Sequence, residues 1–149
     1  MPLDQNRSRR RWMGLLAKAS SAEIDMIWSR LPSLPAYSLL RRPETGLMMV
    51  QGRIGGDGQA FNLGEMTVTR CSVRLDGGTI GHAWIAGRTL RQAERSAVLD
   101  ALLQDRGLDV AMAGMLDLLE RAQAERKGEN SRKVAATKVE FFTMVRGEN

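Results

Sequence analysis

The sequence predicts an α+β protein: helices at both ends flank an antiparallel sheet of about four strands, a meander, and an apolar C-terminal tail follows. Apolar residues recur at helical spacing near both ends, whereas they alternate with period two in the middle. All four prolines lie at or before Pro43, so no proline interrupts the later elements. We expect one domain over residues 1–149, with N-terminal helices in 1–35, the sheet in 36–87, helices in 88–127 and a linker and docking tail in 128–149.

Two short helices are expected first. The first covers Arg9 to Ala19, because apolar side chains recur there at helical spacing, at Trp12, Leu15, Leu16 and Ala19. Ser20 or Ser21 then offers an N-cap for a second helix, with Glu23 in its first turn. The stretch L-P-S-L-P ends that helix.

Alternation begins at Ala36. The segments Y-S-L-L-R-R and L-M-M-V-Q-G-R-I are predicted to pair as a hairpin through the turn P-E-T-G. A glycine-rich loop leads to a third strand, from Glu65 to Leu75, and D-G-G turns the chain into a fourth, T-I-G-H-A-W-I-A-G. The third strand should turn one face to the core, with Thr67, Thr69, Cys71, Val73 and Leu75, and place Arg70, Ser72 and Arg74 on the other.

The single histidine and the single cysteine are both expected to be structural. His82 shares a strand face with Ile80, Trp84 and Ala86, which favours a hydrogen-bonded core histidine over a general base. Cys71 on an inward face is expected to act as a small hydrophobic residue. With one residue of each type, the chain alone makes no intrachain disulfide and no cysteine and histidine metal cluster.

Helical periodicity returns after Gly87. One stripe contains Leu90, Ala93, Ala97, Val98, Ala101 and Leu102. A further helix should bury Met112, Met115, Leu116 and Leu119, and expose Asp117, Glu120 and Arg121. The charged stretch A-E-R-K-G-E-N-S-R-K is predicted to be an exposed linker or helix junction.

The composition makes anionic partners plausible. The net charge is +5 and the pI is near 10.1, which suits nucleic acid, a phosphorylated molecule or an acidic protein face. Only three Trp, three Phe and one Tyr are available for base stacking. No segment approaches a membrane span or a signal peptide, so we expect a soluble, cytoplasmic protein.

Two groups of residues are candidates for contact with an anion or a partner. Successive N–H groups in the glycine-rich loop could form an anion nest, but the loop lies between strands and lacks a nucleotide fingerprint, so a hairpin connection is favoured. Arg70 and Arg74 are the arginine pair most suited to an anion, because they share a strand face. The loop near a partner or anion comprises Gly55, Gly56, Gly58, Phe61, Gly64 and Glu65.

The C-terminal stretch K-V-E-F-F-T-M-V-R-G-E-N is unusually apolar for a chain end. Read as a strand, it carries apolar residues on both faces. It fits a last strand of this molecule and a segment that docks on a partner equally well.

Several motifs together resemble one family. They are R-x-W-M-x-L-L-A, E-T-G-L, G-x-I-G-G-x-G-x-x-F-N-L-G-E-x-T-V-T-R-C-x-V-R-L, G-x-x-W-I-x-G-R, A-E-R-x-A-x-x-D-A-L and V-E-F-F-T-M-V-R-G-E. The sequence resembles the PhnG family, small subunits of bacterial carbon–phosphorus lyase, from about Arg10 to Glu148. Members often have aspartate where Thr89 stands, which leaves an anion or helix-cap role open at that position.

The resemblance implies an accessory subunit in organophosphonate catabolism, needed when methylphosphonate is attached to the ribose of ATP with release of adenine. It implies docking on the other core subunits, especially a nucleosidase-like one. ATP would be a substrate of the complex, and the iron–sulfur cluster and S-adenosylmethionine would sit on another subunit, with no cofactor, metal or catalytic residue on this chain. The docking residues would be Phe141, Phe142, Met144, Val145 and Arg146.

Two alternatives remain open at this stage. One is a stand-alone basic protein that binds nucleic acid or a nucleotide, whose affinity would fall steeply with salt. The other is an independent enzyme that uses His82 or Cys71. If the chain is an accessory subunit, we expect neither nucleic acid nor a membrane among its partners.

Overall fold

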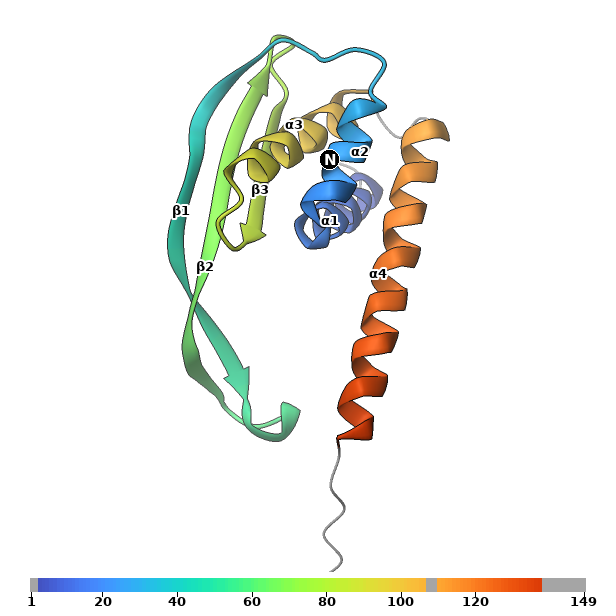
Figure 1. Cartoon of the computed structure of the whole chain (residues 1–149). Coiled ribbons are helices and arrows are strands. Elements are labelled where there is room, and N and C mark those ends of the chain that lie inside the picture. Colours follow the sequence, from blue (N-terminus) through green and yellow to red (C-terminus); the bar gives the residue numbers. More distant parts are fainter. Residues whose placement is uncertain (1–2, 107–109, 138–149) are drawn as a thin grey trace, which may run out of the picture.

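The computed structural model describes residues 3–106 and 110–137, and over this part of the chain four helices lie on one side of a three-stranded antiparallel sheet (Figure 1). The elements in chain order are α1 (Leu3–Lys18), α2 (Ser21–Ser29), β1 (Tyr37–Arg53), the one-turn 3-10 helix η1 (Ile54–Gly56), β2 (Ala60–Leu75), β3 (Ile80–Ala86), α3 (Leu90–Arg106) and α4 (Val110–Ala136). The α+β class is therefore confirmed, and the strand number is lower than predicted.

The two N-terminal helices follow their sequence signals. Ser20 is the N-cap of α2: its hydroxyl accepts a hydrogen bond from the Glu23 backbone N–H, and the Glu23 carboxylate accepts one from the Ser20 N–H at 2.7 Å. Helix α1 begins earlier than the predicted Arg9, because the arginines in its first half are good helix formers.

The sheet is a meander in the order β1-β2-β3, as predicted, but the turn expected at P-E-T-G does not exist. Instead β1 passes straight through these residues and pairs with β2 along its whole length. Pro43 is tolerated because β1 is an edge strand and its pairing with β2 is irregular between Arg41 and Glu44. Two predicted strands are thus one long strand.

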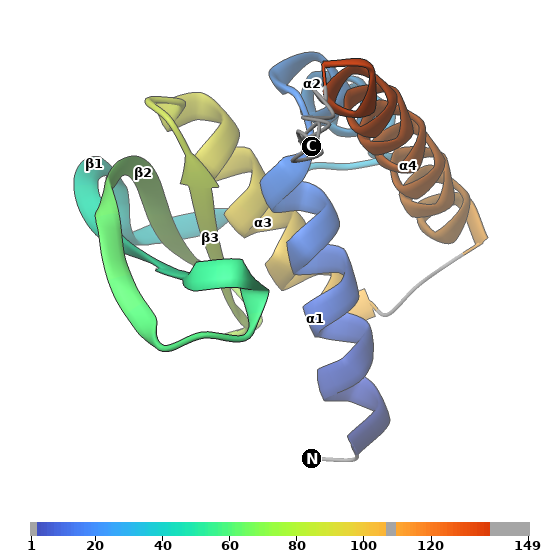
Figure 2. The same ribbon diagram turned by 90° about the horizontal axis from the view of Figure 1, so that it is seen from below.

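Helix α3 lies at the centre of the molecule, between the sheet and α1 (Figure 2). Its small side chains, among them Ala97 and Ala101, are fully buried against Val73 and Ile85 of the sheet. Gly81 of β3 permits this close approach, since a Cβ at that position would lie 2.0 Å from the Ala97 carbonyl oxygen. The sheet and α3 therefore form one core.

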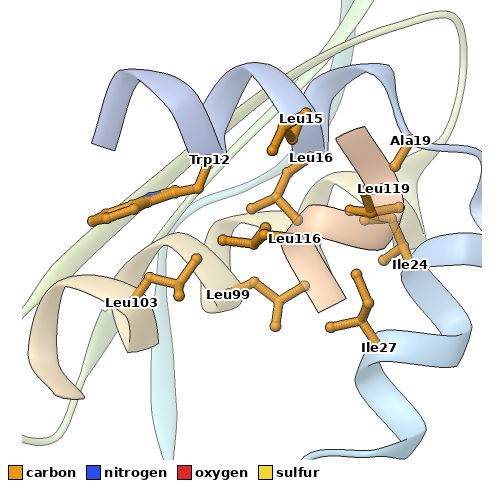
Figure 3. Packing of buried hydrophobic residues seen from close by; sticks show 10 residues of the cluster. All are labelled: Trp12, Leu15, Leu16, Ala19, Ile24, Ile27, Leu99, Leu103, Leu116 and Leu119. Carbon is orange, nitrogen blue, oxygen red and sulfur yellow. The ribbon is translucent and has the colours of Figure 1, made fainter. Parts of the chain in front are cut away.

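The opposite side of α3 contributes to a second, helical core (Figure 3). Leu99 and Leu103 of α3 meet apolar side chains from the three other helices. Those side chains are Trp12, Leu15, Leu16, Ala19, Ile24, Ile27, Leu116 and Leu119. The helical stripes predicted for α1 and α3 are confirmed, apart from Leu90, which is half exposed. In α4, Leu116 and Leu119 are buried as predicted, whereas Met112 and Met115 are only partly buried.

Helix α4 continues through the charged stretch from Ala124 to Lys133, so the prediction of a linker or helix junction there was wrong. Gly128 weakens a helix by only about 1 kcal/mol, and its neighbours are strong helix formers. The predicted exposure of this stretch is confirmed. In the part of the chain described here, no helix has the length and apolarity needed to cross a membrane.

Candidate functional site

A two-stranded arm projects from the sheet (Figure 1). Strand β3 pairs with β2 only from Val68 to Arg74, so within residues 3–106 and 110–137 no third strand lies beside the ribbon formed by residues 47–66. We call residues 47–66 the arm and the rest of the described protein the body. A two-stranded hairpin is marginally stable in water unless something packs on it.

The arm exposes large apolar side chains. Leu47 is 68% exposed, Leu63 66% and Ile54 75%. Met48, Met49 and Phe61 are also exposed. The only charged residues of the arm are Arg53, Asp57 and Glu65. This uncovered apolar surface is typical of a protein interface.

The glycine-rich loop forms the tip of this arm. Gly55 and Gly56 adopt positive φ angles of 65° and 88°, which L side chains rarely adopt. Arg53 closes the turn by donating a hydrogen bond to the Gly58 carbonyl oxygen at 2.9 Å. The loop is a hairpin connection, as favoured from the sequence. Its role toward an anion stays a prediction.

The residues proposed from the sequence as one site are divided by the structure. Gly55, Gly56, Gly58, Phe61, Gly64 and Glu65 all belong to the arm. Arg70 and Arg74 lie on the body instead, on the face of the sheet turned away from α3. Because a strand rises about 3.3 Å per residue, roughly 30 Å separates Phe61 from Arg70.

This outer face of the sheet is polar and basic. The Arg70 guanidinium donates a hydrogen bond to Glu44 at 2.7 Å and lies over the Trp84 ring, 5.4 Å from its centroid. Arg41 also pairs with Glu44, and the two arginines hold the pKa of that carboxyl below its usual range. Arg74 is exposed on the same face.

His82 belongs to this outer face, so the expectation of a core histidine was wrong. Its ring is exposed, and its Nδ1 atom lies 2.8 Å from the Ser72 hydroxyl. The core side of β3 is formed by Gly81, Ala83 and Ile85, and α3 approaches closely at Gly81, which has no side chain. The predicted alternation of this strand is correct, but the face predicted to be buried is the exposed one. Trp84, 49% exposed, shares the outer face.

Asp100 was not singled out from the sequence, yet it joins three elements. Its fully buried carboxylate accepts hydrogen bonds from Arg9 at 2.8 and 3.1 Å, from the Trp12 indole at 2.9 Å and from the His82 backbone N–H at 2.9 Å. Gln104 donates a further bond at 3.2 Å. The signal was an aspartate inside the apolar run A-V-L-D-A-L-L, since a buried charge needs partners.

Cys71 is buried, as expected. Burial raises the pKa of its thiol to about 11, and the neighbouring Glu94 carboxylate acts in the same direction. The thiol donates a hydrogen bond to the Arg41 carbonyl oxygen at 3.4 Å. A thiol in this state is a poor nucleophile near neutral pH. Across residues 3–106 and 110–137, no group of three or more His, Cys, Asp or Glu could hold a metal ion.

Thr89 stands where the resembling family often has aspartate, and it occupies the N-cap position of α3. Its carbonyl accepts the first helical bond, from Ala93 at 2.9 Å, and its N–H donates to Thr69 at 3.2 Å. The Thr89 hydroxyl is buried and has no hydrogen-bond partner in the described structure. A cap role for an acceptor side chain fits this position.

The tail residues predicted to dock, Phe141, Phe142, Met144, Val145 and Arg146, lie outside the described residues. Their role stays a prediction.

The described residues form a small α+β protein with a projecting apolar arm. A family model described as phosphonate metabolism protein PhnG matches residues 7–147. The chain is also 43% identical over 148 residues to the alpha-D-ribose 1-methylphosphonate 5-triphosphate synthase subunit PhnG of Rhizobium meliloti (strain 1021), covering 95% of this chain and 90% of that protein. The chain belongs to the PhnG family of phosphonate metabolism proteins.

Proposed function

We propose that this chain is an accessory subunit of an alpha-D-ribose 1-methylphosphonate 5-triphosphate synthase and acts in organophosphonate catabolism. The family match and the related subunit support this assignment. In this role the chain is needed when the complex attaches methylphosphonate to the ribose of ATP and releases adenine. It works in the cytoplasm and binds neither nucleic acid nor a membrane.

The observation that carries the proposal is the uncovered arm. Leu47, Ile54 and Leu63 are each about two thirds exposed or more, on a ribbon that no other described strand joins. Another subunit of the complex would cover these side chains, and its surface should be largely apolar because the arm has few charges. We assign the nucleosidase-like subunit as this partner.

We assign the C-terminal tail, like the arm, to docking on a partner subunit. It continues from the end of α4, and its composition suits strand addition or apolar insertion on a partner. Arm and tail together would give the small subunit two separate attachments. Two attachments on one chain bind more tightly than either one alone.

The body supports a role without catalysis. Its buried thiol has a raised pKa, and its exposed histidine pairs with a serine hydroxyl, not with a carboxylate of the described residues. The ATP would be bound by the assembled complex, and the iron–sulfur cluster and S-adenosylmethionine would belong to another subunit. One cysteine cannot supply the thiolates that such a cluster requires.

The experiment is co-expression with the nucleosidase-like subunit, followed by size-exclusion chromatography. Three forms of this chain are compared: the full chain, a chain truncated after Lys138, and the arm variant L47S/L63S. The full chain should co-elute, whereas each variant should lose most of the complex. The control is L118S, which removes an exposed leucine from α4 and should assemble normally.

Equal assembly of all four chains would refute docking through arm and tail. Failure of the full chain to co-elute would refute the choice of partner.

Adenine release should appear only when the other subunits are present. If the isolated chain alone released adenine, and S72A or H82N abolished that activity, the chain would be an enzyme in its own right.

A further inference from the structure

A groove runs from the outer face of the sheet around the start of β3, where α1 and α3 approach. It is shallow and open to solvent, with a volume of about 590 Å³. The polar residues that line it are Arg9, Arg41, Ser72, Thr79, His82 and Gln104. No aspartate or glutamate is among the described residues lining it. Thr79 already donates to Asp105, and the Gln104 amide donates to Asp100 and to the Ile80 carbonyl. The donors left for a ligand are those of Arg9, Arg41 and the Ser72–His82 pair, and these favour an anionic ligand.

Arg41 reaches the groove because β1 is irregular there. Its pairing with β2 shifts between Leu39 and Arg41, so the intervening Leu40 is an extra residue. Such a bulge re-aims side chains, and both Leu40 and Arg41 line the groove. Arg41 Nη1 pairs with Glu44, which leaves other N–H groups of the guanidinium for a ligand.

Arg9 is held on the other side of the groove. Its Nε and Nη2 atoms donate to the buried Asp100 carboxylate, so the plane of the guanidinium is fixed. The Nη1 nitrogen takes no part in that pair. The Arg9 side chain is 27% exposed, so a ligand in the groove can reach it.

Ser72 and His82 supply a donor between the two arginines. When the Ser72 hydroxyl donates to Nδ1 of His82, the neutral ring carries its proton on Nε2 and can donate from there. When Nδ1 donates to Ser72, the serine hydroxyl is free to donate instead. Either tautomer therefore offers one N–H or O–H group to an acceptor.

From this arrangement we infer that the groove is a binding site for a phosphate-type dianion, either a free phosphate or phosphonate or the terminal group of a polyphosphate chain. Arginine guanidinium groups match the oxygens of such a ligand, and the Ser72–His82 pair can bond a third oxygen. The site differs from the glycine-rich loop, which lies at the tip of the arm. It is independent of the partner assigned to the arm.

The test is calorimetric titration of the full chain with inorganic phosphate, methylphosphonate and tripolyphosphate at constant ionic strength. Phosphate should saturate with a Kd on the order of 1 mM, as suits a few solvent-exposed charge-assisted hydrogen bonds. Equal affinities for phosphate and tripolyphosphate indicate a free dianion as the ligand. Affinity for tripolyphosphate higher by about 100-fold or more indicates a nucleotide polyphosphate chain.

Three charge variants make the result specific. R41Q should weaken phosphate binding by about tenfold, because it removes a charge-assisted donor. E44Q should tighten it by roughly threefold, because it frees Arg41 from its competing partner. R121Q removes the same charge as R41Q from the exposed surface of α4 and should leave the Kd unchanged.

Absence of saturation up to about 20 mM phosphate would overturn the inference, as this is well above the expected Kd. Equal weakening by R41Q and R121Q would overturn it too, because it would show that only net charge matters. The arm plays no part in these titrations, so their failure leaves the docking proposal standing.

Discussion

The body and the arm contain the same kinds of apolar side chain and use them in opposite ways. In the body, Val73 and Ile24 are fully buried between packed elements, whereas Leu47 and Leu63 of the arm are about two thirds exposed. Burial of one such side chain stabilises a protein by about 1.5–3 kcal/mol. Because Leu47 and Leu63 are largely exposed, the arm gains little of this stabilisation. We therefore expect the body to carry most of the stability of the isolated chain and the arm to contribute little to it.

The largest effect on stability is expected at Asp100. D100A removes the acceptor for Arg9, Trp12 and the His82 backbone N–H in a fully buried place. We expect the free energy of unfolding to fall by about 3–5 kcal/mol, measured by urea denaturation. D105A is the control, because Asp105 is exposed and accepts from the Thr79 hydroxyl, and its loss should stay below about 1 kcal/mol.

The next largest effect is expected where α3 packs on β3. G81A places a Cβ 2.0 Å from the Ala97 carbonyl oxygen and 2.6 Å from the Ala101 nitrogen, so the helix must shift. We expect a loss of about 2 kcal/mol in urea denaturation. G14A, with open space around its Cβ in α1, should instead stabilise by roughly 0.5–1 kcal/mol. Equal responses of the two variants would contradict the packing described for α3.

A smaller effect is expected where α4 meets α2. Burial disfavours the Glu23 carboxylate, but hydrogen bonds from Arg126 and Ser20 outweigh it and lower the pKa of Glu23. E23Q keeps the cap acceptor and loses the ion pair with Arg126, so it should destabilise by about 0.5–1 kcal/mol at pH 7. E125Q, an exposed change of the same charge on α4, is the control.

The same pair predicts a pH dependence. A carboxyl whose pKa is lowered on folding stabilises the protein above its ordinary pKa of about 4.3, and this contribution disappears as the pH falls through the lowered value. The difference between wild type and E23Q should therefore be present at pH 7 and shrink progressively as the pH falls below about 4.3. A difference that does not change as the pH falls would mean that Glu23 acts through packing alone.

The smallest effect on stability is expected in the arm. L47S/L63S changes two large side chains that are already exposed. The free energy of unfolding of the isolated chain should therefore change by no more than about 0.5 kcal/mol. A loss of 2 kcal/mol or more would show that the arm packs on the body, and would remove the contrast between the two regions.

Local sequence signals predicted much of the body. Ser20 and Glu23 form the expected capping box, and Cys71 and Val73 face the core as the alternation indicated. The helical stripes of α1, α3 and α4 also follow from their spacing. These features depend on neighbours close in sequence, which a single chain reveals.

The misread features depend on contacts between distant residues. Pro43 looked like a turn residue, and it is tolerated in β1 because an edge strand needs no donor there. His82 looked inward because glycine and alanine beside it gave no apolar signal, and only the approach of α3 shows that Gly81 faces the core. Asp100 became visible only when α1, α3 and β3 were brought together.

The candidate site was found in pieces for the same reason. The glycine-rich loop was located by its composition, but its place at the end of a long arm depends on β1 and β2 extending past β3. The groove between Arg9 and Arg41 joins residues from five elements, and β1 contributes through its bulge. The periodicity of apolar residues along one element does not reveal such a site.

Amide hydrogen exchange of the full chain, alone and bound to the nucleosidase-like subunit, tests the central claim most directly. Alone, the amides of residues 47–66 should exchange much faster than those of β2 from Val68 to Arg74, which have strands on both sides. In the complex, exchange in the arm should slow by about tenfold or more while that of the sheet in the body stays unchanged. An arm whose exchange is the same in both states would contradict the account, because nothing would then cover it in the assembly.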